Sequence, residues 1–286
     1  MNARLVFKSI VSAAVAAVAL LAAVDAGASV VISGTRVIYR QEDSEVTVKL
    51  SNVGKSPALI QTWMDEGDAS ISASQINVPF TITPPLSRVD PSKGQTLRII
   101  YTGETLPPDR ESVFWLNVLE VPPKPDGDLA QTNHIQLAFR SRIKLFFRPD
   151  GLKGSPDDAP GLLTWQVVHD RGEPSVEVRN PTAYNVSLTD VELVDGPRVS
   201  KSDDGVMVGP GQTANIVLKG TAGSSPAAFV RFHSLNDFGG AVEGKAQLSP
   251  ASAASVLPAT SAAPDTSATR APSATNHDPG ADTATQ

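Results

Sequence analysis

Short stretches in which apolar and polar residues alternate fill the sequence after residue 28, where helical periodicity is hard to find. Residues 45–52 alternate cleanly and place Val46, Val48 and Leu50 on one face, as a half-buried strand requires. The predicted strands are 30–39, 45–52, 58–63, 80–83, 96–101, 112–121, 135–148, 163–169, 175–178, 186–194, 213–218, 227–234 and 241–248. Clusters of Pro, Gly, Asn and Asp between them are typical of turns. The pattern predicts an all-β protein with two immunoglobulin-like sandwiches.

The strands fall into two groups, which a segment rich in Pro, Gly and Asp separates. We therefore predict an N-terminal domain over residues 29–149, a linker over 150–160 and a smaller C-terminal domain over 161–248. Ala, Ser, Thr and Pro make up most of residues 249–286, which contain no aromatic residue. Such a segment buries too little apolar surface to offset its ordering entropy, so we predict a disordered tail.

The first 28 residues have the features of a signal peptide. Arg4 and Lys8 precede an apolar run over residues 10–24, and Ala26-Gly27-Ala28 follows as an A-x-A cleavage site. The alternative is a membrane anchor, but a run of about 15 residues is short of the roughly 20 that span a bilayer. We predict cleavage after Ala28, which makes Ser29 the first residue of an exported mature protein without a membrane span.

Composition argues against several functions. The formal net charge of −6 over 286 residues is unfavourable for a protein that binds nucleic acid by neutralising phosphates. The chain has no cysteine, which excludes disulfides, cysteine nucleophiles, thiolate zinc sites and iron–sulfur clusters. Its 4 histidines do not occur at metal-ligand spacing. We therefore expect neither a metal nor a cofactor.

Catalytic motifs are equally hard to find. The sequence contains no G-x-S-x-G, H-E-x-x-H or P-loop pattern, and no G-x-G-x-x-G after a strand. His233, Ser234 and Asp237 can be written as a catalytic triad, but triads are recognised by geometry rather than by closeness in sequence. Ordinary polar residues explain the three better, and we predict that the protein is not an enzyme.

One segment carries a specific resemblance. Residues 106–123 read LPPDRESVFWLNVLEVPP, and residues 34–39, 83–86, 142–149, 180–182 and 236–240 follow the same pattern in the same order. The sequence resembles the periplasmic pilus (fimbrial) assembly chaperones of the chaperone–usher pathway, the PapD-like family. The short stretch over 124–133 resembles the family's short-loop branch. The resemblance implies two immunoglobulin-like domains in a boomerang arrangement.

Two basic residues match the positions at which this family holds a subunit's terminal carboxylate, Arg36 and Lys144. Arg36 has the strand parity of Ile32 and Ile38, which puts a cation on a partly apolar face. From the residues alone, Arg36 could equally be salt-bridged or snorkelling, and Lys144 could be a solvated strand residue. A carboxylate clamp suits both, since Arg offers a planar fork and Lys a compact charge.

The resemblance also implies a donor strand, which would complete the fold of a bound subunit through Ile135, Leu137 and Phe139. Alternation places these side chains on one face. By pattern alone, that face packs into the protein's own core more often than it stays exposed. An exposed apolar edge favours aggregation, and His134, Gln136 and Arg140 on the other face would counter it.

Three charged residues match an interdomain ionic network of the family: Glu111, Arg148 and Asp237. They could equally be ordinary surface charges. The leading hypothesis is a periplasmic chaperone that binds pilus subunits by donor-strand complementation and delivers them to an outer-membrane usher. Self-dimerisation through the donor strand is a further possibility. The alternative is a secreted immunoglobulin-like adhesion or carbohydrate-binding module.

Overall fold

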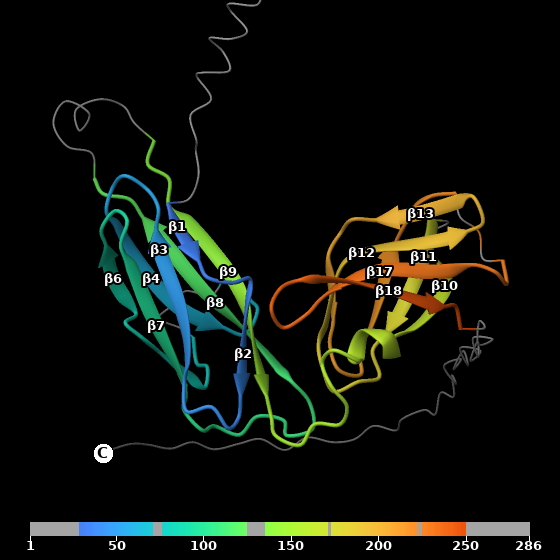
Figure 1. Cartoon of the computed structure of the whole chain (residues 1–286), viewed down its shortest axis with the longest axis horizontal. Coiled ribbons are helices and arrows are strands. Elements are labelled where there is room, and N and C mark those ends of the chain that lie inside the picture. Colours follow the sequence, from blue (N-terminus) through green and yellow to red (C-terminus); the bar gives the residue numbers. More distant parts are fainter. Residues whose placement is uncertain are drawn as a thin grey trace, which may run out of the picture. The chain divides into compact units, whose positions relative to one another are not determined.

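The computed structural model describes residues 29–70, 76–124, 135–170, 173–221, 223 and 225–249. Two groups of strands, each with its own buried core, follow one another along the chain (Figure 1). Among the described residues, no helix is long and apolar enough to cross a membrane. The predicted signal peptide, the segment 125–134 with His134, and the tail beyond Ser249 lie outside the described residues.

Two sheets form the first domain. One has the strand order β1-β3-β7-β5, from β1 (Val30–Ile32), β3 (Val46–Asn52), β7 (Gly94–Tyr101) and β5 (Phe80–Thr83). The other has the order β2-β9-β8-β4-β6, from β2 (Arg36–Arg40), β9 (Phe139–Arg148), β8 (Ser112–Val121), β4 (Ala58–Asp65) and β6 (Leu86–Val89). The alternating apolar faces meet between the sheets, where Leu50, Ile60, Leu97, Leu116 and Leu145 are fully buried. The predicted sandwich is confirmed.

The predicted strand over residues 30–39 is wrong as one continuous element. It divides at Gly34, whose φ of 134° is a conformation that other residues rarely adopt. β1 then pairs antiparallel with β3 in one sheet, whereas β2 pairs parallel with β9 in the other. The alternation of side chains between the two faces is therefore interrupted between Ile32 and Arg36, and the two residues do not share a face. Arg36 and Ile38 do share a face of β2.

The second domain also has two sheets. Its smaller sheet has the order β10-β11-β15, from β10 (Thr164–Asp170), β11 (Glu173–Arg179) and β15 (Thr213–Val217). The larger has the order β16-β13-β12-β17-β18, from β16 (Lys219–Gly220), β13 (Arg198–Ser202), β12 (Val186–Asp195), β17 (Phe229–Leu235) and β18 (Ala241–Gln247), and β14 (Val206–Val208) also pairs with β12. Trp165 stacks on Phe232 in the core with 5.2 Å between ring centroids. A short 3-10 helix, η3 (Ala159–Leu162), precedes β10.

Several elements differ from the sequence prediction. Strands β6, β13, β14 and β16 were not predicted, because each is short and takes its register from a longer neighbour rather than from its own alternation. The predicted strand over 135–148 begins only at Phe139. Residues 135–138 precede it as irregular backbone.

Candidate functional site

Sheet register places Arg36 and Lys144 side by side. They are direct partners in the parallel pairing of β2 with β9. Lys144 in turn lies opposite Trp115 of β8, and Trp115 lies opposite Asp65 of β4. The four residues therefore form one row across the sheet, on the face that points away from the core of the first domain.

Arg36 is half-buried and reaches the second domain. Its Nη1 donates a hydrogen bond of 3.0 Å to the carbonyl oxygen of Leu235, at the end of β17. Its guanidinium lies 5.5 Å from the ring centroid of Phe146, and its Nε is buried without a hydrogen-bond partner. Burial lowers the pKa of Arg36, and the nearby charges of Asp237 and Glu111 act in the opposite direction. Most buried donors in folded proteins have a partner, so the Nε of Arg36 is an exception.

Lys144 has no carboxylate partner within ion-pair distance in the described ranges. Its Nζ lies 5.2 Å from the ring centroid of Trp115. Burial, and to a smaller extent the charge of Arg36, lower the pKa of Lys144. A partly buried ammonium beside a guanidinium, with no described carboxylate within ion-pair distance of either, is an electrostatic site for a carboxylate.

Both side chains line one cleft, which has a volume of about 410 Å³ and includes residues of the two domains. The walls from the first domain include Thr35, Trp115, Arg142 and Ile143, and those from the second include Ser187, Leu188, Thr189, Met207 and Leu235. The cleft is therefore basic on one wall and largely apolar or hydroxylated on the other.

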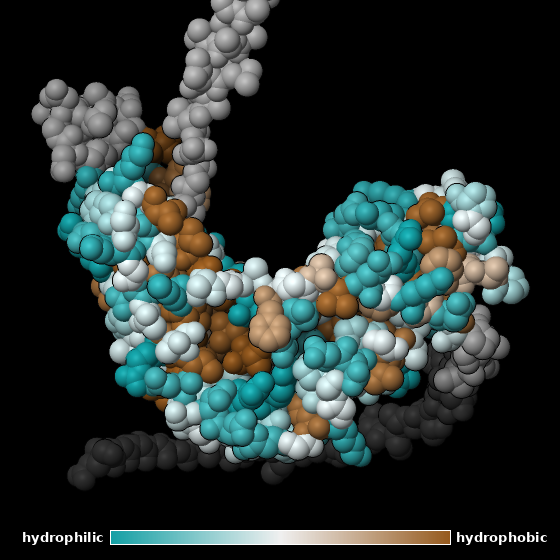
Figure 2. All heavy atoms as spheres, in the orientation of Figure 1, coloured by the Kyte–Doolittle hydropathy of each residue, from teal (hydrophilic) through white to brown (hydrophobic). Residues whose placement is uncertain are grey.

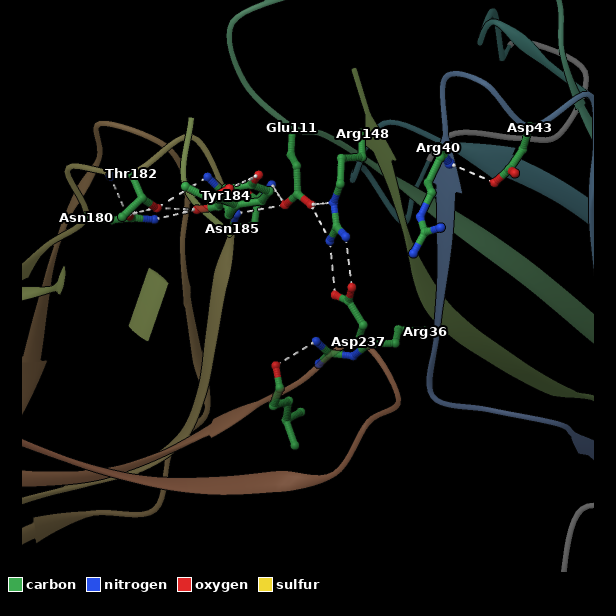
Figure 3. A network of polar contacts seen from close by, with 12 residues as sticks. Arg36, Arg40, Asp43, Glu111, Arg148, Asn180, Thr182, Tyr184, Asn185 and Asp237 are labelled. Atoms are coloured by element: carbon green, nitrogen blue, oxygen red, sulfur yellow. Dashed lines mark hydrogen bonds and ion pairs between the residues drawn. The ribbon is translucent and has the colours of Figure 1, made fainter. Parts of the chain in front are cut away.

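An ionic network centred on Arg148 joins the two domains (Figure 3). The Arg148 Nε donates to Glu111 at 2.8 Å, and its two terminal nitrogens donate to Asp237 at 2.8 and 3.0 Å. The second Glu111 oxygen accepts from the backbone N–H of Asn185 at 2.8 Å. Burial alone would lower the pKa of Arg148, but the carboxylates of Asp237 and Glu111 raise it above its ordinary value. The sequence-predicted trio therefore lies together.

A second polar cluster, not predicted from the sequence, supports the row of Lys144. The buried Asp65 carboxylate accepts from Arg142 Nη2 at 2.5 Å and from Asn117 Nδ2 at 2.7 Å, and it lies 3.6 Å from Arg140 Nη2. The Arg142 guanidinium lies 4.6 Å from the centroid of Trp115. Trp115 thus contacts both Arg142 and Lys144. The alternation of Arg140, Arg142 and Lys144 along β9 was the sequence signal for this cluster.

We expect Asp65→Asn to lower the free energy of unfolding by about 2 kcal/mol, because charge-assisted bonds to Arg142 are lost from a buried position. Denaturant unfolding followed by tryptophan fluorescence measures the change. Asp90→Asn is the matched control, since Asp90 pairs with Arg88 at an exposed site. Equal stability of the two variants would contradict a supporting role for Asp65.

The edge of β9 is only partly covered. β2 pairs with Lys144–Arg148, whereas β8 pairs with the whole of Phe139–Phe147. On the β2 side, the stretch 139–143 therefore has no neighbouring strand among the described residues. The exposed fraction of the residue is 87% at Ile135, 60% at Leu137 and 41% at Phe139. The apolar face is thus exposed rather than packed in the domain's own core.

Residues 135–138 nevertheless run beside the end of β8. The Nε2 of Gln136 donates to the carbonyl oxygens of Pro122 and Pro123, at 2.9 and 3.2 Å. Figure 2 shows apolar side chains reaching the surface of the first domain in several places. An open strand edge that continues into exposed apolar side chains can accept a further strand.

The structure does not bring together His233, Ser234 and Asp237, the three residues that can be written as a catalytic triad. His233 Nδ1 lies 2.9 Å from Asp190, Ser234 Oγ donates to the carbonyl oxygen of Val242, and Asp237 is held by Arg148. The side chains point to separate partners, so this group has no triad geometry.

The fold and the site define a class of protein: tandem immunoglobulin-like domains with an open apolar strand edge beside a basic cleft. The chain belongs to the pili-assembly chaperone family. The family model described as "Pili and flagellar-assembly chaperone, PapD N-terminal domain" matches residues 29–153, and "Pili assembly chaperone PapD, C-terminal domain" matches residues 158–246.

Curated relatives agree with this assignment. The chain is 50% identical over 224 residues to the probable fimbrial chaperone YadV of Escherichia coli K12, which covers 77% of this chain and 90% of YadV. It is 48% identical over 220 residues to the chaperone protein FimB/FhaD of Bordetella pertussis, which covers 75% and 86% of the two chains.

Solved structures show the same architecture. The crystal structure of the YadV chaperone matches with a TM-score of 0.66 at 46% identity, and covers 77% of this chain and 100% of that one. The SafB chaperone, in complex with the SafA pilin of Salmonella enterica, matches with a TM-score of 0.64 at 29% identity and covers 79% and 99%. An adhesion or carbohydrate-binding module is not favoured.

Proposed function

We propose that the protein is a periplasmic chaperone that binds pilus subunits by donor-strand complementation and passes them to an outer-membrane usher. The observation that carries the proposal is the edge of β9, which is open among the described residues and lies next to two cations that form no ion pair with any described carboxylate. The name of the matched SafB–SafA complex describes a chaperone bound to a pilin, which is the same kind of partner.

In this proposal, Arg36 and Lys144 bind the terminal carboxylate of the subunit. Arg36 contributes directed N–H donors and Lys144 a mobile point charge. Because the two residues are register partners, a carboxylate that contacts both is fixed at one position along β9. The register of the whole subunit strand against β9 follows from that single contact.

The donor segment, residues 135–143, supplies the rest of the interface. Backbone N–H and C=O groups on its open side form ladder hydrogen bonds with the subunit, and Ile135, Leu137 and Phe139 fill apolar pockets in it. The chaperone needs no nucleotide or cofactor, because it holds the subunit short of its final fold and the free energy retained in that way is released on strand exchange. The same open edge would allow a free chaperone to pair with a second copy.

Other parts of the chain have supporting roles in the proposal. The ionic network of Glu111, Arg148 and Asp237 fixes the two domains around the cleft. Residues 1–28 direct export, residues 150–160 link the domains 29–149 and 161–248, and residues 249–286 extend beyond them. The proposed activity is binding and delivery, not catalysis.

Leu137→Ala tests the role of the donor segment in subunit binding, and the chain offers a matched control variant. We expect the variant to bind subunit about 10-fold more weakly, since a leucine that becomes buried contributes about 1.5–3 kcal/mol. Val53→Ala is the control, because Val53 is 68% exposed in a turn outside the cleft, comparable to the 60% of Leu137. Affinity is measured by titrating purified mature protein with a subunit from the same pilus system.

Neither residue is buried, so both variants should unfold at the wild-type denaturant concentration. Equal subunit affinity in the two variants, with tight binding by the wild type, would overturn the assignment of the donor segment. Absence of any subunit binding by the wild type would instead overturn the proposed function.

A further inference from the structure

Glu120 is a buried carboxylate that the proposed function leaves unexplained. It lies on β8 and is 7% exposed. One oxygen accepts from the backbone nitrogen of Ser29 at 3.3 Å and from the Ser29 hydroxyl, and the other accepts from the backbone N–H of Val30 at 3.0 Å. All of these donors belong to the first residues that the structure describes.

Glu120 differs from the other buried carboxylates in its ion pairing. Four carboxylates are buried among the described residues: Asp65, Glu111, Glu120 and Asp195. Asp65 pairs with Arg142, Glu111 with Arg148 and Asp195 with Arg198. In the same ranges, only Glu120 lacks a cation within ion-pair distance. An ionised carboxylate in a buried site is costly unless it is paired, so a missing cation is expected at this position.

The amino terminus of the mature protein is the cation that fits. The A-x-A pattern predicts hydrolysis of the Ala28–Ser29 peptide bond by a signal peptidase. Water supplies a hydroxyl to the Ala28 carbonyl carbon as the C–N bond breaks, and the nitrogen of Ser29 takes up protons. With an α-amino pKa of about 7.7–8.0, that nitrogen is mainly an ammonium at neutral pH.

We propose that Glu120 is the binding site of the processed amino terminus, so that cleavage after Ala28 creates a partly buried ion pair between the Ser29 ammonium and Glu120. Two independent observations agree on the bond that is cut: the small residues before Ser29, and the position of the Ser29 nitrogen against an unpaired carboxylate. The proposal does not depend on subunit binding.

The ion pair joins the two sheets of the first domain. Val30 pairs with Asn52 of β3 in one sheet, whereas Glu120 belongs to β8 in the other. Glu120 is also the register partner of Phe139, the first residue of β9. Processing therefore stabilises the end of the sandwich where the donor segment enters β9. A chain that keeps even one residue before Ser29 has an amide nitrogen at this position and lacks the charge.

The test is a double-mutant cycle on the mature protein. Four proteins are compared: the chain beginning at Ser29 and the same chain with one additional N-terminal glycine, each with Glu120 or with Glu120→Gln. In the Glu120 background, we expect the extra glycine to lower the folding equilibrium constant about 10-fold. In the Glu120→Gln background, we expect a change of less than about 2-fold, because the charge that the ammonium contacts is absent.

Mass spectrometry of protein secreted from the full-length gene gives a second measurement that needs no variant, and we expect a mature chain that begins at Ser29. The α-amino pKa, followed by NMR, should be raised in the wild type and ordinary in Glu120→Gln. Equal effects of the extra glycine in both backgrounds, or a mature chain that begins at another residue, would overturn the proposal.

Discussion

Replacing Lys144 with alanine is expected to weaken subunit binding about 100-fold and to leave the stability of the free protein unchanged. Removing one partner of a close ionic contact at an interface costs about 2–5 kcal/mol, and about 2.7 kcal/mol corresponds to 100-fold. The free protein loses nothing comparable, since Lys144 contacts no carboxylate within its described residues. Affinity by calorimetry and unfolding by denaturant measure the two quantities.

The pH dependence of binding tests the same contact. In the free protein, the pKa of Lys144 is below its ordinary value because of burial and the charge of Arg36. A bound carboxylate raises that pKa, so the contribution of Lys144 is complete below the free-state pKa and is lost as pH rises toward the bound-state value. The affinity of Lys144→Arg for the subunit should change much less with pH in the alkaline range, since arginine stays charged.

A subunit with a C-terminal amide supplies the matched control. It should bind the wild type at least as weakly as the natural subunit binds Lys144→Ala, and the variant should distinguish the two subunits less than the wild type does, because only Arg36 still contacts the carboxylate. If Lys144→Ala still preferred the free carboxylate as strongly as the wild type does, Lys144 would not be part of the anchor. Arg36→Ala should weaken subunit binding similarly. It should also lower the stability of the free protein, because the hydrogen bond from Arg36 to the carbonyl oxygen of Leu235 is lost.

Arg148→Ala is expected to lower the free energy of unfolding by about 3–5 kcal/mol and to separate the domains from one another. The substitution leaves the Glu111 carboxylate, whose side chain is 1% exposed, without its cation. It also removes both bonds to Asp237. Thermal unfolding measures the stability, and limited proteolysis of residues 150–160 measures the coupling of the domains.

Arg231→Ala is the control for this prediction. Arg231 pairs with Glu192 between β17 and β12 inside the second domain, at a partly exposed position. We expect a loss of less than about 1 kcal/mol and no change in cleavage of the linker. Protease resistance of the linker in Arg148→Ala equal to that of the wild type would show that the network does not hold the domains together.

Much of the fold could be predicted from local pattern. Strands such as Ser112–Val121 and Phe80–Thr83 appear with the predicted bounds, because alternation and flanking turn residues define them without help from distant residues. The strand over 30–39 could not be predicted correctly, since its division depends on which sheet each half joins. Gly34 permits the division, but glycine alone does not reveal it.

The site was predictable in a different way. Arg36 and Lys144 were identified by resemblance to the family. Charge and alternation alone do not distinguish a basic residue that binds a carboxylate from one that is salt-bridged or solvated. The sheet register then makes them direct neighbours. The Asp65 cluster was missed, since its members come from β4, β8 and β9, and only pairing between distant strands brings them together.

The sequence by itself determined that this chain forms two β-sandwiches and contains no cysteine-based chemistry, because alternation and composition are properties of local segments. Tertiary structure alone decided which stretch of β9 has no neighbouring strand on this side among the described residues, because β2 pairs only with Lys144–Arg148. Among the described residues, it also decided which buried carboxylates have a cation and which one does not. Ion pairing depends on distances between residues far apart in sequence, such as the 77 positions between Asp65 and Arg142.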